Sequence, residues 1–168
     1  MAVTDYLTGI PNRAGMYQYL NAMDKSGFAT FLYTDIDNFK MVNDCFGHIV
    51  GDRLLKSVAK LFRSALPDSF TARIGGDEFL SIISPRVERQ ELETAVKALM
   101  EGIKRLTCYP QEILDTISLS IGVLYLHPLE DSLNSIMRKS DEGMYQAKRA
   151  GKNRYCFYEP VEFQSDYN

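Results

Sequence analysis

Cysteine, charge of one sign and long apolar runs are all scarce in this sequence of 168 residues. Its three cysteines, Cys45, Cys108 and Cys156, are odd in number and form no CxxC pair. That pattern argues against both a disulfide framework and a cysteine zinc site. The formal net charge of −3 is too small for a global field that would recruit nucleic acid or an anionic membrane. We therefore expect no nucleic-acid partner.

No apolar run approaches the roughly 20 residues that a membrane-spanning helix needs. The opening residues, MAVTDYLTGIPNR, lack the basic-then-apolar layout of a signal peptide. We therefore expect the chain to be cytoplasmic and to contain no membrane segment. Whether a longer parent protein is anchored to a membrane stays open.

The composition that is present is typical of a soluble globular domain, with 45% hydrophobic and 24% charged residues. Internal repeats and low-complexity stretches are absent. The sequence predicts one domain over residues 1–158, followed by a polar C-terminal tail over residues 159–168.

Hydrophobic periodicity predicts helices interleaved with strands. The expected helices cover residues 12–23, 39–46, a stretch after Gly51, 87–106 and 132–150. The expected strands cover residues 28–36, 70–74, 78–83, 116–126 and 154–159. Because a hairpin turn at residues 75–77 joins two of these strands, the pattern favours an α/β (α+β) fold with helices packed on a mixed central β-sheet.

Acidic side chains lie at the C-terminal end of the buried strand at residues 28–36 and on the hairpin turn: Asp35, Asp37, Asp77 and Glu78. One interpretation is local, with Asp35 starting a turn, Asp37 capping the next helix and Asp77 shaping the hairpin. The other is that the two loops converge and present carboxylates to Mg²⁺, which prefers hard oxygen ligands. Clustered carboxylates are unfavourable unless a cation or proton neutralises them. The residue pattern alone leaves both interpretations open.

Glycine and basic side chains allow similar pairs of interpretations. Gly75 and Gly76 suit a turn with positive φ, or let a nucleotide approach the backbone closely. A basic cluster at the end of the last helix is favourable beside the helix dipole, or serves with a metal to hold a triphosphate. This cluster consists of Lys148, Arg149, Lys152 and Arg154.

Five sequence blocks occur in a characteristic order: DYLTGIPNR, DIDNFKMVNDCFGHIVGD, RIGGDEF, SLSIGV and SDEGMYQAKRAGKNR. Together they resemble the GGDEF domain of diguanylate cyclases, and the resemblance extends to about Tyr158. It implies a fold similar to the polymerase palm and to nucleotidyl cyclases. It also implies an enzyme, a nucleotidyltransferase that condenses two GTP into cyclic di-GMP and releases two pyrophosphates.

The resemblance also implies roles for individual residues. The metal ligands would be Asp35, the backbone carbonyl of Ile36, and Asp77. The guanine base would be read by Asn43 and Asp52. The phosphates would be held by Lys40, Lys148 and Lys152, with help from the backbone of Asp37, Asn38 and Phe39 and close approach at Gly75 and Gly76. Catalysis would involve Asp35, Asp77 and Glu78, of which Glu78 would assist deprotonation of the 3′-hydroxyl.

The cofactor implied is Mg²⁺, two ions per active half-site, with Mn²⁺ expected to substitute. The implied partners are a second copy of the chain, in a homodimer that can be transient, and an upstream sensory or receiver domain in the parent protein. The alternative function is a catalytically silent GGDEF domain that binds GTP and regulates a partner. A cyclase that uses mixed ATP and GTP is disfavoured by Asp52.

Overall fold

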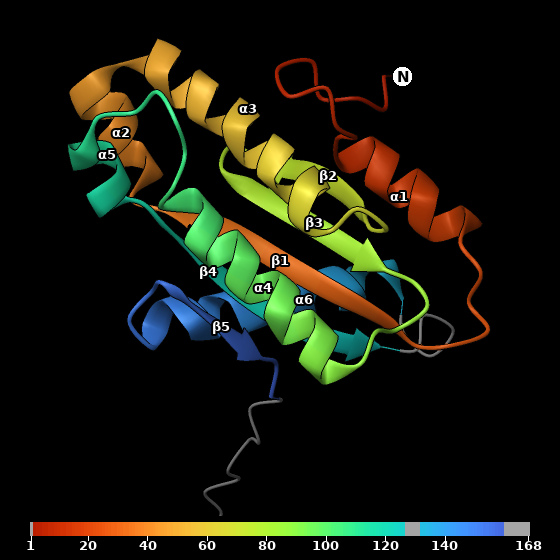
Figure 1. Ribbon diagram of the computed structural model, residues 1–168. Coiled ribbons are helices and arrows are strands. Elements are labelled where there is room, and N and C mark those ends of the chain that lie inside the picture. Colours follow the sequence, from red (N-terminus) through yellow and green to blue (C-terminus); the bar gives the residue numbers. More distant parts are fainter. Residues whose placement is uncertain (1, 127–131, 160–168) are drawn as a thin grey trace, which may run out of the picture.

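The computed structural model describes residues 2–126 and 132–159, which form a five-stranded sheet with helices on both faces (Figure 1). The elements in chain order are α1 (Arg13–Ala22), β1 (Ala29–Asp37), α2 (Phe39–Phe46), α3 (His48–Ala65), β2 (Phe70–Gly75), β3 (Glu78–Ile83), α4 (Arg89–Ile103), α5 (Gln111–Thr116), β4 (Ser118–Leu126), α6 (Leu133–Arg149) and β5 (Arg154–Phe157). The predicted α/β class with a mixed sheet is confirmed. Beyond residue 159, the expected polar tail lies outside the described residues.

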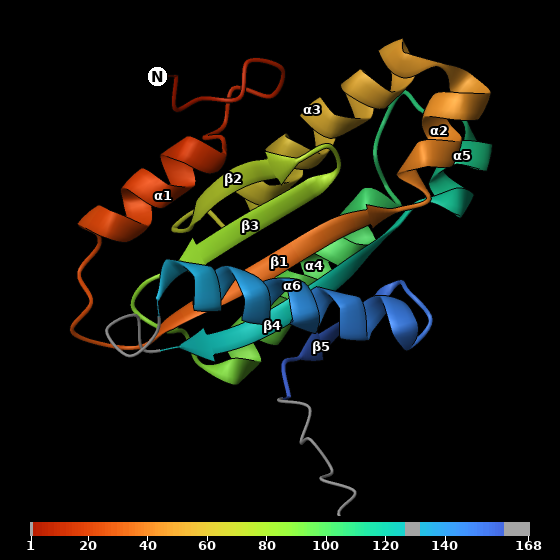
Figure 2. The ribbon, with the colours of Figure 1, turned by 180° about the vertical axis from the view of Figure 1, so that it is seen from behind.

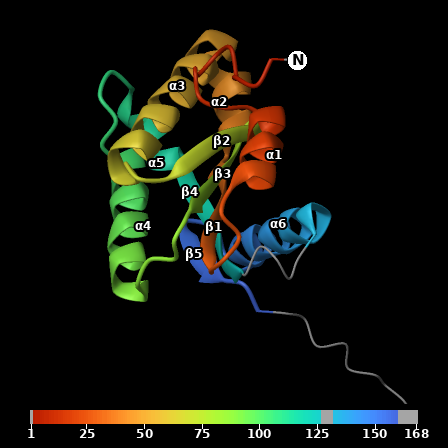
Figure 3. The same ribbon diagram turned by 90° about the vertical axis from the view of Figure 1, so that its right-hand side faces the viewer.

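The central strand, β1, organises the sheet, whose order is β2-β3-β1-β4-β5. It pairs antiparallel with β3 and β4, while β4 pairs parallel with β5. Every residue of β1 is buried, because α3 and α4 cover one face of the sheet and α1 and α6 cover the other (Figures 2 and 3). Within the described ranges, no helix is both long and apolar enough to cross a membrane.

The alternation of side chains along β1 divides the core into two clusters. Leu32 and Ile36 face α3 and α4, whereas Phe31 and Tyr33 face α1 and α6. By the same alternation, Asp35 follows Tyr33 on the face that α6 covers. The strand period therefore directs this carboxylate toward the C-terminal half of α6, at the end of the central strand.

Several element boundaries differ from the sequence prediction by two or three residues, such as the ends of α4 and β5, and two differences change the local structure. Residue 116, expected to begin a strand, instead ends the short helix α5, whose six residues are too few to display a helical period. The helix expected after Gly51 already begins at His48, directly after Gly47, whose positive φ of 89° separates α2 from α3. Gly51 therefore lies inside a helix.

A contact between two glycines sets how closely α6 approaches the sheet. Gly122 of β4 packs against Gly143 of α6, and a Cβ atom added to Gly122 would lie 2.2 Å from the Met144 backbone nitrogen. Because this obstacle is backbone, a side chain at Gly122 cannot be accommodated by a rotamer change. The close crossing also places the last turns of α6, including Lys148, beside the end of β1.

Gly122→Ala should therefore push α6 away from β4 and lower the free energy of unfolding by about 1–3 kcal/mol, the usual cost of overpacking. Urea unfolding followed by circular dichroism measures this change. Gly27→Ala is the matched control, since an added Cβ there meets nothing within 4 Å. Equal stabilities of the two variants would contradict the packing argument.

Candidate functional site

The end of β1 and the β2–β3 turn lie against each other. Asp35 is opposite Glu78 in the antiparallel register, and the backbone N–H of Ile36 donates to the carbonyl oxygen of Asp77 at 3.2 Å. The structure therefore brings the two acidic segments together. The sequence alone did not decide whether their carboxylates have separate local roles or share one site.

Asp35 is almost fully buried and forms an ion pair with Lys148, whose Nζ contacts Oδ2. Burial and the hydrogen bond shared with Asp77 raise the pKa of the Asp35 carboxyl to about 7, although Lys148 acts in the opposite direction. Burial by itself would lower the pKa of Lys148, but the hydrogen bond and charge of Asp35, with the charge of Asp77, raise it. One ammonium thus faces a pair of crowded carboxylates.

The donor set at this point fits a hard divalent cation. Oδ1 of Asp35 is buried without a hydrogen-bond partner, and the neighbouring Asp77 adds a second carboxylate. Among the described residues, no group of three or more His, Cys, Asp or Glu side chains could hold a metal. Two carboxylates together with substrate phosphates are, however, a usual ligand set for Mg²⁺.

The structure gives Asp37 a different role from the one expected. Its buried carboxylate accepts hydrogen bonds from the Ser118 hydroxyl and the Ser120 hydroxyl, both at 2.6 Å, and from the Asn153 backbone N–H at 3.0 Å. The N-cap of α2 is Asn38, so the interpretation of Asp37 as a helix cap is wrong. Asp37 instead ties β4 and the loop after α6 to the end of β1.

This loop directs Lys152 toward the same region. Gly151, Lys152 and Asn153 have φ values of 124°, 62° and 47°, a left-handed run that turns the chain back after α6. The Lys152 ammonium donates to Oδ1 of Asn38 at 3.5 Å. The hydrogen bond from Asn153 to Asp37 holds this turn in place.

An open cleft of about 510 Å³ is lined by seven of the residues expected to bind metal or phosphate, whereas Asp35, Asp37, Gly75 and Gly76 are not among its lining residues. It is lined by Ile36 and Asp77, by Asn38 and Phe39 at the start of α2, and by the lysines Lys40, Lys148 and Lys152. Carboxylates and ammonium groups facing one cleft suit a metal ion bound together with a polyphosphate.

Asn43 and Asp52 lie outside the lining of this cleft. Oδ1 of Asn43 is buried and unpartnered, and a Cβ added to Gly51 would lie 1.9 Å from it, so a side chain at Gly51 would displace the Asn43 amide. Asp52 is exposed on α3 and lines a second cleft of about 430 Å³, which also includes the side chain of Tyr6. Sequence reasoning assigned no role to Tyr6, which is 97% exposed.

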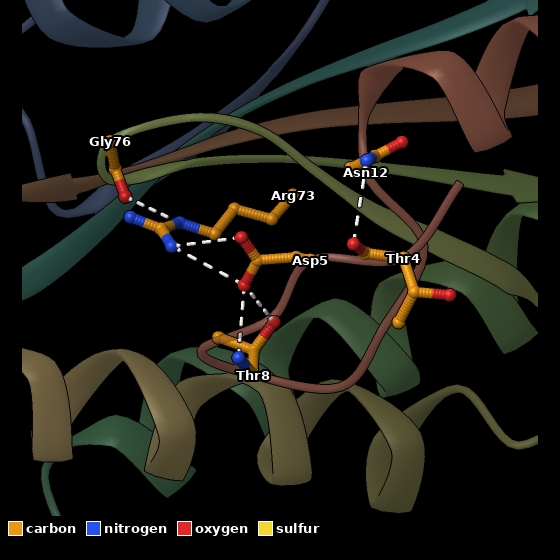
Figure 4. A network of polar contacts seen from close by, with 6 residues as sticks. All are labelled: Thr4, Asp5, Thr8, Asn12, Arg73 and Gly76. Carbon is orange, nitrogen blue, oxygen red and sulfur yellow. Dashed lines mark hydrogen bonds and ion pairs between the residues drawn. The ribbon is translucent and has the colours of Figure 1, made fainter. Parts of the chain in front are cut away.

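An ion pair fixes the β2–β3 turn from the N-terminal side (Figure 4). Nη1 of Arg73 donates to Oδ1 of Asp5 at 3.1 Å, and its Nε donates to the Gly76 carbonyl oxygen at 2.9 Å. Burial would raise the pKa of Asp5, but hydrogen bonds from Thr8 and the charge of Arg73 lower it. Asp5 and Arg73 belong to two recognisable sequence blocks, yet the sequence carries no sign that they pair across 68 positions.

Glu78 begins β3 and is half-buried. Its Oε2 accepts a hydrogen bond from the Tyr33 hydroxyl at 2.9 Å. Burial and the charge of Glu78 raise the pKa of Tyr33, so this hydroxyl stays a donor. The sequence marks Tyr33 as an ordinary core residue of a buried strand, and nothing in its spacing signals this contact.

Comparison with known proteins identifies one family. The sequence profile described as "Diguanylate cyclase, GGDEF domain" matches residues 2–154. A "Diguanylate cyclase" of Vibrio cholerae serotype O1 is 37% identical, covering 94% of this chain and 50% of that protein. "Cyclic di-GMP phosphodiesterase PdeR" of Escherichia coli K12 is 34% identical, covering 95% of this chain and 24% of that protein. The chain thus spans half or less of the length of these curated relatives.

A solved structure agrees with these sequence matches. The GGDEF domain of DgcB from Caulobacter crescentus, determined in complex with c-di-GMP, has a TM-score of 0.80 and 31% sequence identity to this chain. The match covers 94% of this chain and 96% of that one. The resemblance inferred from the five sequence blocks is therefore confirmed.

The raised pKa of Asp35 predicts a pH-dependent stability in the metal-free protein. The folded state binds the Asp35 proton more tightly than the unfolded state, in which the pKa is 3.8. The protonated carboxyl therefore contributes to the free energy of unfolding below pH 4, and this contribution is lost as the pH rises through about 7. Asp35→Asn should therefore gain stability relative to the wild type between pH 5 and pH 8.

Urea unfolding in EDTA at several pH values measures this difference. Asp24→Asn is the control, because hydrogen bonds from Ser26 lower the pKa of Asp24 and place its titration below this range. Parallel stability profiles of wild type and Asp35→Asn would show that Asp35 is not the titrating group.

Proposed function

Since the chain belongs to the GGDEF domain family of diguanylate cyclases, we propose that it condenses two GTP into cyclic di-GMP with release of two pyrophosphates. The observation that carries this proposal is the crowding of Asp35 and Asp77 beside Lys148, next to a cleft that Asp77, Lys148 and two further lysines line. The second candidate is a catalytically silent domain that binds GTP and regulates a partner. It is kept because one relative is named a phosphodiesterase.

Asp35, the carbonyl of Ile36, and Asp77 would hold two Mg²⁺ ions, with Mn²⁺ as a substitute. Bound there, the metals would lower the pKa of the attacking 3′-hydroxyl and balance charge on the leaving pyrophosphate. The unpartnered Oδ1 of Asp35 and the raised pKa of that carboxyl support this assignment, since both mark a site that lacks enough positive charge.

Lys40, Lys148 and Lys152 would bind the triphosphate, with the backbone of residues 37–39 and the exposed turn at Gly75 and Gly76 close to it. Lys148 stays protonated, because its acidic neighbours raise its pKa. Fixed ammonium groups at the cleft orient the α-phosphate for in-line attack and stabilise the charge that develops on the leaving group. Glu78 would accept the proton of the attacking 3′-hydroxyl as the new phosphodiester bond forms.

Asn43 and Asp52 would recognise guanine. An aspartate carboxylate can accept hydrogen bonds from guanine N1–H and N2–H₂, whereas adenine has a lone pair at N1 and no amine at C2. Binding ATP would leave the carboxylate unpaired, which is costly.

Two chains would be needed for the complete reaction. The described part of the chain holds one set of the proposed metal-, phosphate- and guanine-binding residues, enough for one GTP. The reaction joins two GTP molecules, and each 3′-hydroxyl must face the α-phosphate of the other. A two-fold pairing of half-sites meets this requirement and replaces a bimolecular encounter with an oriented one. An upstream sensory or receiver domain would control the pairing in a longer parent protein.

Incubating the purified chain with GTP and Mg²⁺ and identifying the product by mass spectrometry tests the proposal. Cyclic di-GMP supports it. GTP binding without any product favours the silent domain, and a mixed dinucleotide formed when ATP is added would contradict strict guanine selection.

Asp77→Asn should abolish turnover and leave the fold intact, because it removes one metal ligand from an accessible turn. A pyrophosphate-release assay together with circular dichroism measures both properties. Asp68→Asn, which removes an exposed carboxylate from a distant loop, should remain as active as the wild type. Near-normal activity of Asp77→Asn would remove Asp77 from the metal site.

Asp52→Ser should reduce selectivity for GTP over ATP by at least about tenfold, or about 1.4 kcal/mol, because the acceptor for both guanine donors is lost. Turnover with the two nucleotides in competition, under Mg²⁺, measures the selectivity. An unchanged ratio would mean that guanine is read by other residues.

Specific activity should rise with protein concentration, because the half-sites must meet. Activity and light scattering measured over the same concentration range test this expectation. A leucine zipper fused before Asp5 should raise the activity at low concentration. Constant specific activity in a range where scattering reports only monomer would rule out the half-site arrangement.

A further inference from the structure

We propose that Tyr33 is a positioning residue that holds the Glu78 carboxylate in place for the reaction proposed above, on which this inference rests. The hydroxyl of Tyr33 donates to Oε2 of Glu78 at 2.9 Å. The two residues lie on adjacent strands and are 45 positions apart in the sequence.

The strand register brings these two side chains together. Asp35 lies opposite Glu78, and Tyr33 lies opposite Leu80. Residues two apart on a strand share a face, so Tyr33 and Glu78 are diagonal neighbours across the β1–β3 pair. Diagonal neighbours are about 7–8 Å apart at Cα, a span that a long aromatic side chain can bridge. The contact therefore follows from the pairing that also places Asp35 at the site.

Tyr33 is a rigid anchor, whereas Glu78 is not. Only 4% of Tyr33 is exposed, and it belongs to the buried cluster that includes Met16 and Met144. A close-packed core holds an aromatic ring in one rotamer, so the hydroxyl has a defined position. Among the described residues, Tyr33 is the only hydrogen-bond donor to the Glu78 side chain. Without it, the half-buried carboxylate would be free to rotate.

The chemistry of this donor suits a group that must take up a proton. A phenol hydroxyl occupies one acceptor position of the carboxylate and leaves its other oxygen, Oε1, available. Because the donor is neutral, it orients Glu78 without cancelling its charge. Asp35, by contrast, is paired with the cationic Lys148. The two adjacent carboxylates thus have different partners: Asp35 is paired with an ammonium group, and Glu78 is held by a neutral hydroxyl.

If the contact between Tyr33 and Glu78 were purely structural, the expected effect of removing the hydroxyl would differ. A buried tyrosine hydroxyl needs a hydrogen-bond partner, and Glu78 could serve only as that partner. In that case, loss of the hydroxyl would change the stability of the fold and leave the chemical step untouched.

Tyr33→Phe keeps the ring and removes the hydroxyl. We expect kcat for cyclic di-GMP formation to fall about tenfold, as one hydrogen bond to a charged group allows, while KM for GTP stays within about twofold. In a Glu78→Gln background, adding Tyr33→Phe should cause little further loss. Tyr109→Phe is the matched control, because it loses a comparable hydroxyl contact with Ser57, at 2.8 Å, away from the site. Its kcat should match that of the wild type.

Activity is divided by the fraction of folded protein from circular dichroism, so a loss of stability in Tyr33→Phe does not mimic a loss of kcat. In a Glu78→Asp background, where the shorter side chain already withdraws the carboxylate from Tyr33, Tyr33→Phe should change kcat much less than it does in the wild type. Unchanged kcat in Tyr33→Phe, or losses that multiply independently in the double variant, would overturn the positioning role. An inactive wild-type protein would overturn the proposed function, and this inference with it.

Discussion

The antiparallel pairing of β1 with β3 is the constraint on which the site depends. It places Asp35 opposite Glu78 and lets the Ile36 N–H donate to the Asp77 carbonyl. A shift of one residue would turn Asp35 to the other face of the sheet, away from Lys148. Burial of β1 on both faces opposes such a shift, because every side chain of the strand is packed. The core thus determines the geometry of the carboxylates.

Repulsion between carboxylates at the end of β1 is the second feature on which the site depends. Asp35 is buried beside Asp77, which raises its pKa, and a single ion pair with Lys148 offsets part of the repulsion. This arrangement lowers the stability of the metal-free protein at neutral pH. In the proposed function, a bound metal ion would relieve the repulsion between these carboxylates, and this relief would favour binding of the metal and the triphosphate. Stability and ligand affinity therefore oppose each other at this point of the fold.

The sequence allowed much of the fold to be predicted, because long helices and buried strands have clear periods. It also located Asp77 and the three lysines that line the cleft of about 510 Å³. It misassigned Asp37, whose hydrogen bonds to Ser118, Ser120 and Asn153 join segments more than 80 positions apart. It also missed α5, which is too short to show a period. Both errors arise because a local sequence pattern shows neither the distant partners of a side chain nor the period of a very short helix.

Sequence by itself determined the fold class, the family and the residue types available for chemistry, because these follow from periodicity and from ordered motifs. Tertiary structure alone decided how those residues are paired. Arg73 reaches Asp5, and Tyr33 reaches Glu78, only after the strands have aligned. The close crossing at Gly122 likewise brings Lys148 to Asp35. Each pairing depends on packing between distant segments, which no local window of sequence specifies.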